Sequence, residues 1–185
     1  MHKKLPNIYH FVDDLNINEI IKIDKNIGII YRNCQIKPNI NKIIHFKNYC
    51  KNNKRIFLIA NNFNLASQLN LDGFYISAFN KKNINRYRNN KSIIVGAAHN
   101  LKEIRIKEKQ GVDQIFLSPI FKILKSDHFL GLLRFNLLSK LTNKPIIALG
   151  GINSQNIKKI KMTNSIGFAS ITYIKKKKKF SKINL

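Results

Sequence analysis

The feature of this chain that most restricts its fold is a repeat, in which apolar segments of strand length alternate with segments of helical periodicity about every 20 to 25 residues. The apolar segments predict eight strands, over residues 8–12, 27–31, 55–60, 73–76, 92–97, 114–117, 145–149 and 166–169. The segments between them predict helices over residues 17–23, 38–49, 64–69, 81–88, 101–109, 134–141 and 155–162. Because strands that alternate with helices usually pair in one direction, the pattern predicts a parallel sheet.

Eight such units favour a closed barrel over an open doubly wound sheet. An open sheet of that kind usually carries a glycine-rich phosphate loop after its first strand, whereas residues 13–16 here, Asp-Asp-Leu-Asn, contain no glycine. The predicted fold is a small single-domain (β/α)8 TIM barrel over residues 1–174, followed by a basic C-terminal tail over residues 175–185. The eighth helix is expected to be truncated, because residues 171–174 run directly into five consecutive lysines.

The chain is strongly basic, with a formal net charge of +25 over 185 residues. Such a charge first suggests nucleic-acid or membrane binding. However, only 6 of the 34 basic residues are arginine, and no cluster of arginine and aromatic side chains, which would stack on bases, stands out. Lysine, asparagine and isoleucine share codons rich in A and T, so genome composition and a solvated surface explain the charge better. We therefore expect no nucleic-acid partner.

Nothing in the sequence predicts attachment to a membrane or export. No apolar run reaches the roughly 18 residues of a transmembrane helix, and the N-terminal residues lack the apolar region of a signal peptide. Cys34 and Cys50 have neither the spacing of metal ligands nor the number needed for a disulfide framework. We expect a cytoplasmic protein with reduced thiols, and the sequence leaves its oligomeric state open.

Two of the apolar segments near the C-terminus end in small residues, Gly150-Gly151 and Ala169-Ser170. Parallel barrels carry their sites at the carboxyl ends of the strands, and a phosphate frequently sits on the loops after the seventh and eighth strands. Glycine lets backbone N–H groups approach an anion without an obstructing Cβ atom. The four residues are therefore candidate phosphate ligands, and the alternative for the glycines is a tight turn into the next helix.

Two charged or titratable residues end other predicted strands. Arg32 follows the second strand and would either clamp a phosphate or pair with Asp13 or Asp14. His99 follows the fifth strand and would either carry a proton or help to begin the next helix. Carboxylates are too scarce at the strand ends to predict a dedicated divalent-metal site from composition alone.

Several motifs in the C-terminal half occur together and in a fixed order. They are Ala97-Ala-His-Asn100, Gly111-Val-Asp-Gln-Ile-Phe-Leu-Ser-Pro-Ile-Phe121, Leu130-Gly131, Pro145-Ile-Ile-Ala-Leu-Gly-Gly-Ile152 and Gly167-Phe-Ala-Ser-Ile171. As a set they resemble the thiamine-phosphate synthase family and its sister group, the TenI thiazole tautomerases. The resemblance extends over nearly the whole chain, from residue 6 to residue 174. Both groups are eightfold α/β barrels, so the resemblance implies the same fold.

The resemblance also implies an activity in thiamine biosynthesis. The synthases join a pyrimidine methyl diphosphate to a thiazole phosphate and release pyrophosphate, whose departure is stabilised by Mg²⁺ and by cationic side chains. Small phosphorylated substrates and Mg²⁺ are therefore the implied ligands. The implied substrate-binding residues are Ser118, Gly150, Gly151, Ala169 and Ser170, and the implied catalytic residues are Arg32, Lys125 and His99.

The family's two metal-binding aspartates align with Asn61 and Asn80, which follow the third and fourth strands. Exchanging two carboxylates for amides is expected to weaken Mg²⁺ binding, because affinity for the metal depends on ligand charge. Two alternatives to the synthase therefore stay open. One is a metal-independent thiazole phosphate tautomerase in which His99 or His128 moves the proton, and the other is a non-catalytic binder of thiamine or thiazole phosphates.

Overall fold

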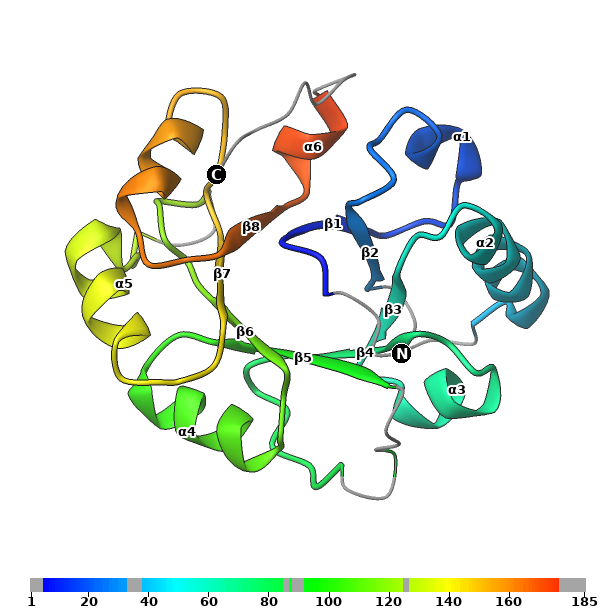
Figure 1. Ribbon diagram of the computed structural model, residues 1–185, viewed down its shortest axis with the longest axis horizontal. Helices are drawn as coiled ribbons and strands as arrows, with labels where there is room; N and C mark the ends of the chain where they lie inside the picture. Colours follow the sequence, from blue (N-terminus) through cyan, green and yellow to red (C-terminus); the bar gives the residue numbers. More distant parts are fainter. Residues whose placement is uncertain (1–4, 33–37, 85–86, 88–91, 125–126, 177–185) are drawn as a thin grey trace.

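The computed structural model describes residues 5–32, 38–84, 87, 92–124 and 127–176. Within them, strands and helices alternate along the chain (Figure 1). The strands are β1 (Ile8–Val12), β2 (Gly28–Tyr31), β3 (Phe57–Ala60), β4 (Gly73–Ile76), β5 (Ile93–Ala98), β6 (Gln114–Leu117), β7 (Ile146–Leu149) and β8 (Gly167–Ser170). The helices are α1 (Ile17–Ile20), α2 (Ile40–Asn52), α3 (Phe63–Gln68), α4 (Leu101–Lys109), α5 (Gly131–Ser139), the 3₁₀ helix η2 (Ile157–Met162) and α6 (Thr172–Lys176).

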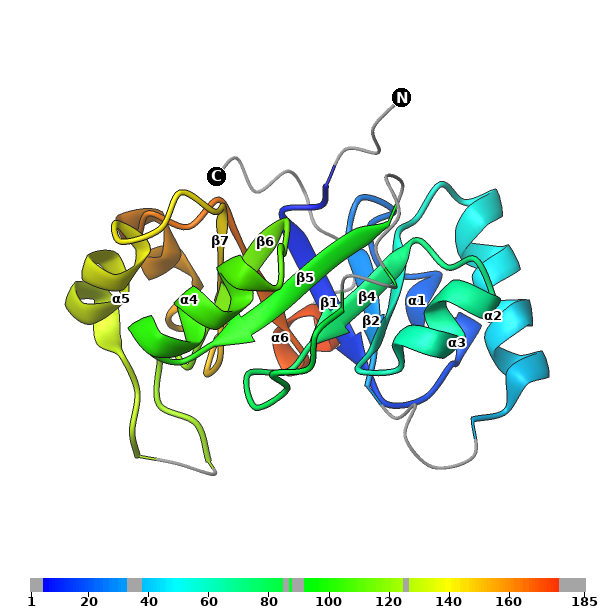
Figure 2. The ribbon, with the colours of Figure 1, turned by 90° about the horizontal axis from the view of Figure 1, so that it is seen from below.

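The eight strands form a closed barrel in chain order, and β8 pairs with β1 to complete it. Every pairing is parallel, so all carboxyl-terminal ends lie at one end of the barrel. The helices surround the strands (Figure 1), and the connection from β6 to α5 extends below the barrel at its carboxyl end (Figure 2). The predicted small (β/α)8 barrel is confirmed.

The barrel has two apolar layers, because successive side chains of a strand point to opposite faces. Every strand contributes to the lumen, where the rings of Tyr9, Phe11, Tyr75 and Phe116 pack with centroid distances of 5.0–6.1 Å. The opposite faces of the same strands pack against the helices and form the larger of the two clusters. The lumen is therefore a packed core, as in other barrels of this size.

Asparagine begins four of the helices. The side chains of Asn16, Asn39, Asn62 and Asn100 each accept a hydrogen bond from a backbone N–H in the first turn of α1, α2, α3 and α4. Such N-caps satisfy one of the N–H groups that have no partner within the helix. Asparagines of this chain thus fix where these four helices begin.

The helix predicted over residues 81–88 is absent at residues 81–84, whereas Tyr87 is in a 3₁₀ conformation and its backbone N–H donates to the carbonyl of Ile84. This segment is polar, and Asn80 instead accepts a hydrogen bond from the backbone N–H of Lys82. Helix α5 begins three residues earlier than predicted, at Gly131. The short α6 agrees with the truncated last helix, and residues 177–185 of the predicted tail lie outside the described residues.

A buried arginine holds the opposite, amino-terminal end of the barrel. Arg55 lies just before β3 and is 3% exposed. Its guanidinium donates hydrogen bonds to the backbone carbonyls of Ile20, Ile23, Asp24 and Ile27, at 2.7–3.3 Å. These carbonyls belong to the connection between α1 and β2. Arg55 therefore fastens a loop that contains no predicted site residue.

Candidate active site

The Gly150-Gly151 pair follows β7 and passes very close to the segment that follows β6. Both residues have a positive φ, of 96° and 71°. A Cβ atom on Gly150 would lie 2.6 Å from Cβ of Pro119, and one on Gly151 would lie 2.5 Å from the carbonyl oxygen of Lys122. The glycines are therefore required by close backbone packing as well as by a positive φ. A side chain at either position would disturb the fold, so phosphate binding here has to be tested by changes elsewhere.

The same packing brings the predicted phosphate ligands together. The backbone N–H of Phe121 donates to the carbonyl of Gly150, at 3.2 Å, and Leu149 pairs with Ala169 across β7 and β8. Neither Gly150 nor Gly151 donates its own N–H to another described residue. Ser118, which forms a cis peptide bond with Pro119, is buried beside them. This part of the barrel end offers backbone N–H groups and few side chains.

The hydroxyl of Ser170 has a structural task. It accepts a hydrogen bond from the backbone N–H of Tyr173 and so supports the start of α6, at 3.1 Å. Its carbonyl accepts a hydrogen bond from Nδ1 of the buried His10, at 3.0 Å. Burial lowers the pKa of His10, against the opposing effects of this hydrogen bond and of Glu19, and the charges of Lys175 and Arg55 lower it further. The carbonyl of Ser170 and the acceptor side of its hydroxyl are therefore both engaged within the protein.

Arg32 pairs with Asp13, as one of the two interpretations of the sequence proposed. Its Nε donates to Oδ1 at 2.9 Å and one terminal nitrogen donates to Oδ2 at 2.5 Å, and the guanidinium carbon lies 5.7 Å from the ring centroid of Phe11. Both side chains are partly exposed at the carboxyl ends of β1 and β2. A bidentate carboxylate fixes the plane of the guanidinium and leaves other N–H groups for an anion.

Asn61 and Asn80 lie together, as expected from their places after β3 and β4. Oδ1 of Asn61 accepts hydrogen bonds from the backbone N–H of Ser77 at 3.0 Å and from Nδ2 of Asn80 at 3.2 Å, while its Nδ2 donates to the hydroxyl of Ser77 at 2.6 Å. Asn61 takes the left-handed backbone conformation, with φ of 57°, which asparagine tolerates. We call these three residues the amide cluster.

The amide cluster does not fit a divalent metal. Oδ1 of Asn61 already takes two hydrogen bonds, and Oδ1 of Asn80 takes one from the backbone N–H of Lys82. Mg²⁺ prefers charged oxygen ligands with free lone pairs, whereas these amides are neutral and both lone pairs of Asn61 Oδ1 are already used. Among the described residues, no group of three or more histidine, cysteine, aspartate or glutamate side chains could hold a metal.

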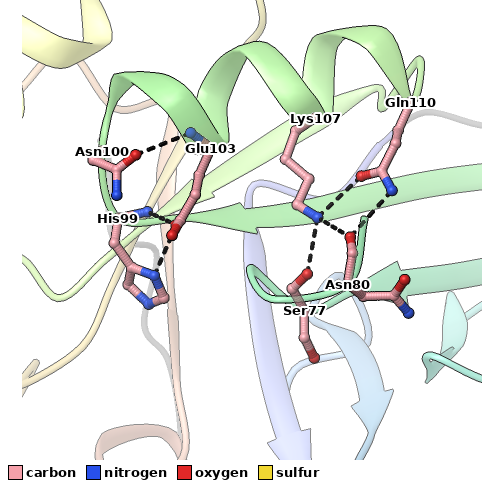
Figure 3. A network of polar contacts seen from close by, with 7 residues as sticks. All are labelled: Ser77, Asn80, His99, Asn100, Glu103, Lys107 and Gln110. Atoms are coloured by element: carbon pink, nitrogen blue, oxygen red, sulfur yellow. Dashed lines mark hydrogen bonds and ion pairs between the residues drawn. The ribbon is translucent and has the colours of Figure 1, made fainter. Parts of the chain in front are cut away.

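His99 is held by Glu103, one turn into α4 (Figure 3). Oε2 of Glu103 accepts from the backbone N–H of His99 at 2.7 Å and contacts Nδ1 at 2.9 Å, while Asn100 caps the helix. Because an ionised carboxylate only accepts hydrogen bonds, Nδ1 is the donor in this contact, and in a neutral ring Nε2 is then the acceptor. His99 thus both begins α4, as the alternative interpretation proposed, and presents one ring nitrogen that can accept a proton.

Sequence reasoning missed Lys107, a fully buried lysine on α4. Its Nζ donates to the carbonyls of Ser77 and Asn80, both at 2.8 Å, and to Oε1 of Gln110 at 3.0 Å. Gly96 of β5 leaves room for the aliphatic stem, since a Cβ atom there would lie 2.8 Å from Cδ of Lys107. Burial lowers the pKa of Lys107 to about 8, against the opposing effect of Glu103.

A signal for Lys107 was present in the sequence. It lies three residues after the buried Ile104, on the same face of the predicted helix over residues 101–109. A lysine in that position either places its ammonium outside the core or finds buried oxygen acceptors. The sequence does not show which, because the acceptors come from a connection 27 to 30 residues earlier.

Three residues considered in the sequence analysis, Lys125, Cys34 and Cys50, contribute nothing to the described site. Lys125, an implied catalytic residue, and Cys34 both lie outside the described residues. Cys50 is buried in the apolar layer beneath α2, where burial raises the pKa of its thiol to about 12. No helix in the described part of the chain has the length and apolar character needed to cross a membrane.

Comparisons with known proteins agree on one family. A family model described as thiamine monophosphate synthase matches residues 28–174. The thiamine-phosphate synthase of Pelagibacter ubique is 30% identical over 189 residues, which cover 96% of this chain and 87% of that relative. The thiamine-phosphate synthase of Prochlorococcus marinus strain SARG is 29% identical over 149 residues, but the match spans only 43% of its length.

A solved structure has the same fold. Thiamine phosphate pyrophosphorylase from Pyrococcus furiosus superimposes with a TM-score of 0.73, over 89% of this chain and 85% of that chain, at 18% sequence identity. At that identity the likeness establishes the barrel and nothing finer. The family model and the Pelagibacter relative extend over most of the chain, and they show that it belongs to the thiamine monophosphate synthase family.

Proposed function

We propose that this barrel joins a pyrimidine methyl diphosphate to a thiazole phosphate. The bond between the methylene carbon and the diphosphate oxygen breaks, diphosphate leaves with the electron pair, and the thiazole nitrogen forms a new bond to that carbon. The observation that carries the proposal is the family match over residues 28–174, which includes the Gly150-Gly151 loop and the ends of β2 to β8.

The thiazole phosphate is assigned to the loops after β7 and β8. The backbone N–H groups of Gly150 and Gly151 donate to no other described residue and can therefore donate to phosphate oxygens. Ala169 is fully buried, and its methyl group packs in the lumen of the barrel. Ser118 precedes Pro119, which packs against Gly150, and Ser170 ends β8 beside β1; both are proposed to contact the same ligand.

The diphosphate is assigned to the ends of β2, β3 and β4. Arg32 is held in one orientation by Asp13 and directs its remaining N–H groups at an anion. The amide cluster lies farther round the same half of the barrel mouth. These donors stabilise the negative charge that develops on the leaving group. No step is assigned to Mg²⁺, because the residues at Asn61 and Asn80 do not fit it.

Other roles remain predictions. His99, with Nδ1 held by Glu103 and a side chain that is about half exposed, is proposed to accept a proton at Nε2. Lys125 is proposed as a second cation for the diphosphate. A cytoplasmic location, the absence of a nucleic-acid partner and the boundary of the domain at residue 174 also remain predictions.

The first test is turnover of the purified protein with both substrates, with Mg²⁺ or with EDTA, read out as thiamine phosphate. Product formation is expected. The absence of product in both conditions, together with thermal stabilisation by thiazole phosphate alone, would replace the synthase by a tautomerase or a binder.

A substitution of Arg32 tests how the site is divided. Arg32→Ala is expected to weaken diphosphate binding by about tenfold, since it removes charge-assisted hydrogen bonds, and to leave thiazole phosphate binding unchanged. Arg105→Ala is the matched control, because Arg105 also pairs with a carboxylate on the surface but lies on α4. Equal losses for both ligands in Arg32→Ala would contradict the division.

A further inference from the structure

The amide cluster is oriented by groups that can only donate. The backbone N–H of Ser77 donates to Asn61, and the backbone N–H of Lys82 donates to Asn80, so the atom that receives each bond must be the amide oxygen. The orientation of both amides follows, and Nδ2 of Asn80 then points at Oδ1 of Asn61. Two carboxylates in these places would repel each other and need a cation between them, whereas two amides complement each other.

The cluster therefore presents donors and hides acceptors. Its amide oxygens and the hydroxyl oxygen of Ser77 accept hydrogen bonds from within the cluster or from the backbone. The carbonyls of Ser77 and Asn80 accept from the ammonium of Lys107. The second proton of each amide and the hydroxyl proton of Ser77 remain, and such a set suits an anion.

Lys107 and Gln110 hold the connection that carries two members of the cluster. Figure 3 shows both side chains reaching from α4 to the backbone after β4. Nε2 of Gln110 donates to the carbonyls of Asn80 and Lys82, at 3.1 and 2.8 Å. Four hydrogen bonds from these two side chains thus hold the connection from residue 77 to residue 82, and a fifth joins Lys107 to Gln110.

We propose that Lys107 is a positioning residue that fixes the connection after β4, from which Ser77 and Asn80 contact Asn61 at the end of β3, so that the amide cluster receives a diphosphate group without a protein-bound divalent metal. The inference rests on the proposed function for the identity of the anion. It differs from that function because it states which residue shapes the site and that the site needs no metal.

Binding of inorganic pyrophosphate to the full chain, measured by calorimetry, tests this proposal. We expect the affinity to change less than about threefold between EDTA and Mg²⁺ after correction for the Mg²⁺ complex of pyrophosphate in solution. Lys107→Met should weaken binding about tenfold or more, and Lys109→Met, an exposed lysine on the same helix, should not. A wild-type affinity that rises tenfold with Mg²⁺ would overturn the proposal.

Hydrogen exchange separates this inference from the proposed function, because it needs no ligand. In Lys107→Met the backbone amides of residues 77–82 are expected to exchange faster, while those of β7 and β8 are unchanged. Unchanged exchange at residues 77–82 would overturn the positioning role. Should Lys107→Met fail to fold, Gln110→Leu provides the same comparison. Pyrophosphate binding without turnover would remove the proposed function and leave this inference standing.

The converse variant tests the metal directly. In Asn61→Asp/Asn80→Asp, two facing carboxylates replace the complementary amides, and Mg²⁺ is expected to raise the melting temperature of this variant and not that of the wild type. An equal response of both proteins to Mg²⁺ would show that the amides bind the metal as well as carboxylates do, against the proposal.

Discussion

The two ends of the barrel each contain a buried cation that donates to backbone carbonyls, and the two cations differ in kind. At the amino-terminal end, the guanidinium of Arg55 contacts four carbonyls of the connection between α1 and β2. At the carboxyl-terminal end, the ammonium of Lys107 contacts two carbonyls of the connection after β4. Burial lowers both pKa values, but a guanidinium starts so high that it keeps its charge.

The two buried cations suit the different roles of the two ends of the barrel. Arg55 presents a planar fork with five donors, which suits a loop that has to stay fixed. Lys107 presents a point charge on a flexible stem, shared with Gln110, next to residues that would contact a substrate. We therefore expect changes at Arg55 to alter stability without altering ligand binding in the folded protein, and changes at Lys107 to alter ligand binding as well.

The largest effect is expected for Arg55→Met. Removing the guanidinium leaves buried carbonyls without their donors, and the free energy of unfolding should fall by about 3 kcal/mol or more. Arg55→Lys should recover less than half of that loss, because an ammonium cannot reach all four oxygens. Urea unfolding followed by circular dichroism provides the measurement. Arg55→Met should lose more stability than Lys107→Met, because removing Lys107 also relieves the cost of burying an ammonium. A smaller loss for Arg55→Met would contradict the comparison.

A pH-dependent effect is expected at His10, which lies close enough to Arg55 to be affected by its charge. Its pKa is lowered in the folded state, so the unfolded chain binds more protons below about pH 6.5. The stabilising contribution of neutral His10 is therefore present above that pH and is lost as the pH falls towards the folded pKa. His10→Asn keeps a donor for the carbonyl of Ser170 but does not titrate.

The measurement is the free energy of unfolding of wild type and His10→Asn at several values between pH 7.5 and 5, about one unit on either side of the reference histidine pKa. As the pH falls, the free energy of unfolding of the wild type should decrease relative to that of His10→Asn. The exposed His45, changed to asparagine, serves as the control and should not reproduce this shift.

The smallest effect is expected for Asp13→Asn. The pair that Asp13 forms with Arg32 is partly exposed, with side chains 61% and 37% accessible, and such pairs contribute less than about 1 kcal/mol to stability. Asp14→Asn, which removes the neighbouring pair with Lys42, is the matched control. A loss of stability as large as that of Arg55→Met would mean that the exposed Arg32 contributes as much to stability as the buried Arg55.

Much of the fold could be predicted from the sequence, because the alternation of apolar segments and helical segments has one compact solution. The strands were found to within two residues, and α4 over residues 101–109 was found at its full length. The helix predicted over residues 81–88 failed because the local pattern is weak there and side chains from α4 hold residues 80 and 82 by their carbonyls. Contacts between residues distant in the sequence therefore determine the conformation of that segment.

The candidate site, too, could be predicted only in part. The nearness of Asn61 to Asn80 and of Arg32 to Asp13 could be predicted, since the carboxyl ends of neighbouring parallel strands meet at one edge. The sequence could not show that the amides satisfy each other or that Ser170 uses its hydroxyl to support α6. Those outcomes depend on side-chain orientation, which a strand register alone does not determine.

The aromatic rings in the lumen have a consequence for the route by which ligands enter and leave. Because Tyr9, Phe11, Tyr75 and Phe116 fill the interior of the barrel, no ligand passes through the barrel from one end to the other. A ligand of the loops after the strands therefore enters and leaves on the side of the carboxyl ends. The packing of the core thus sets the direction from which the site is reached.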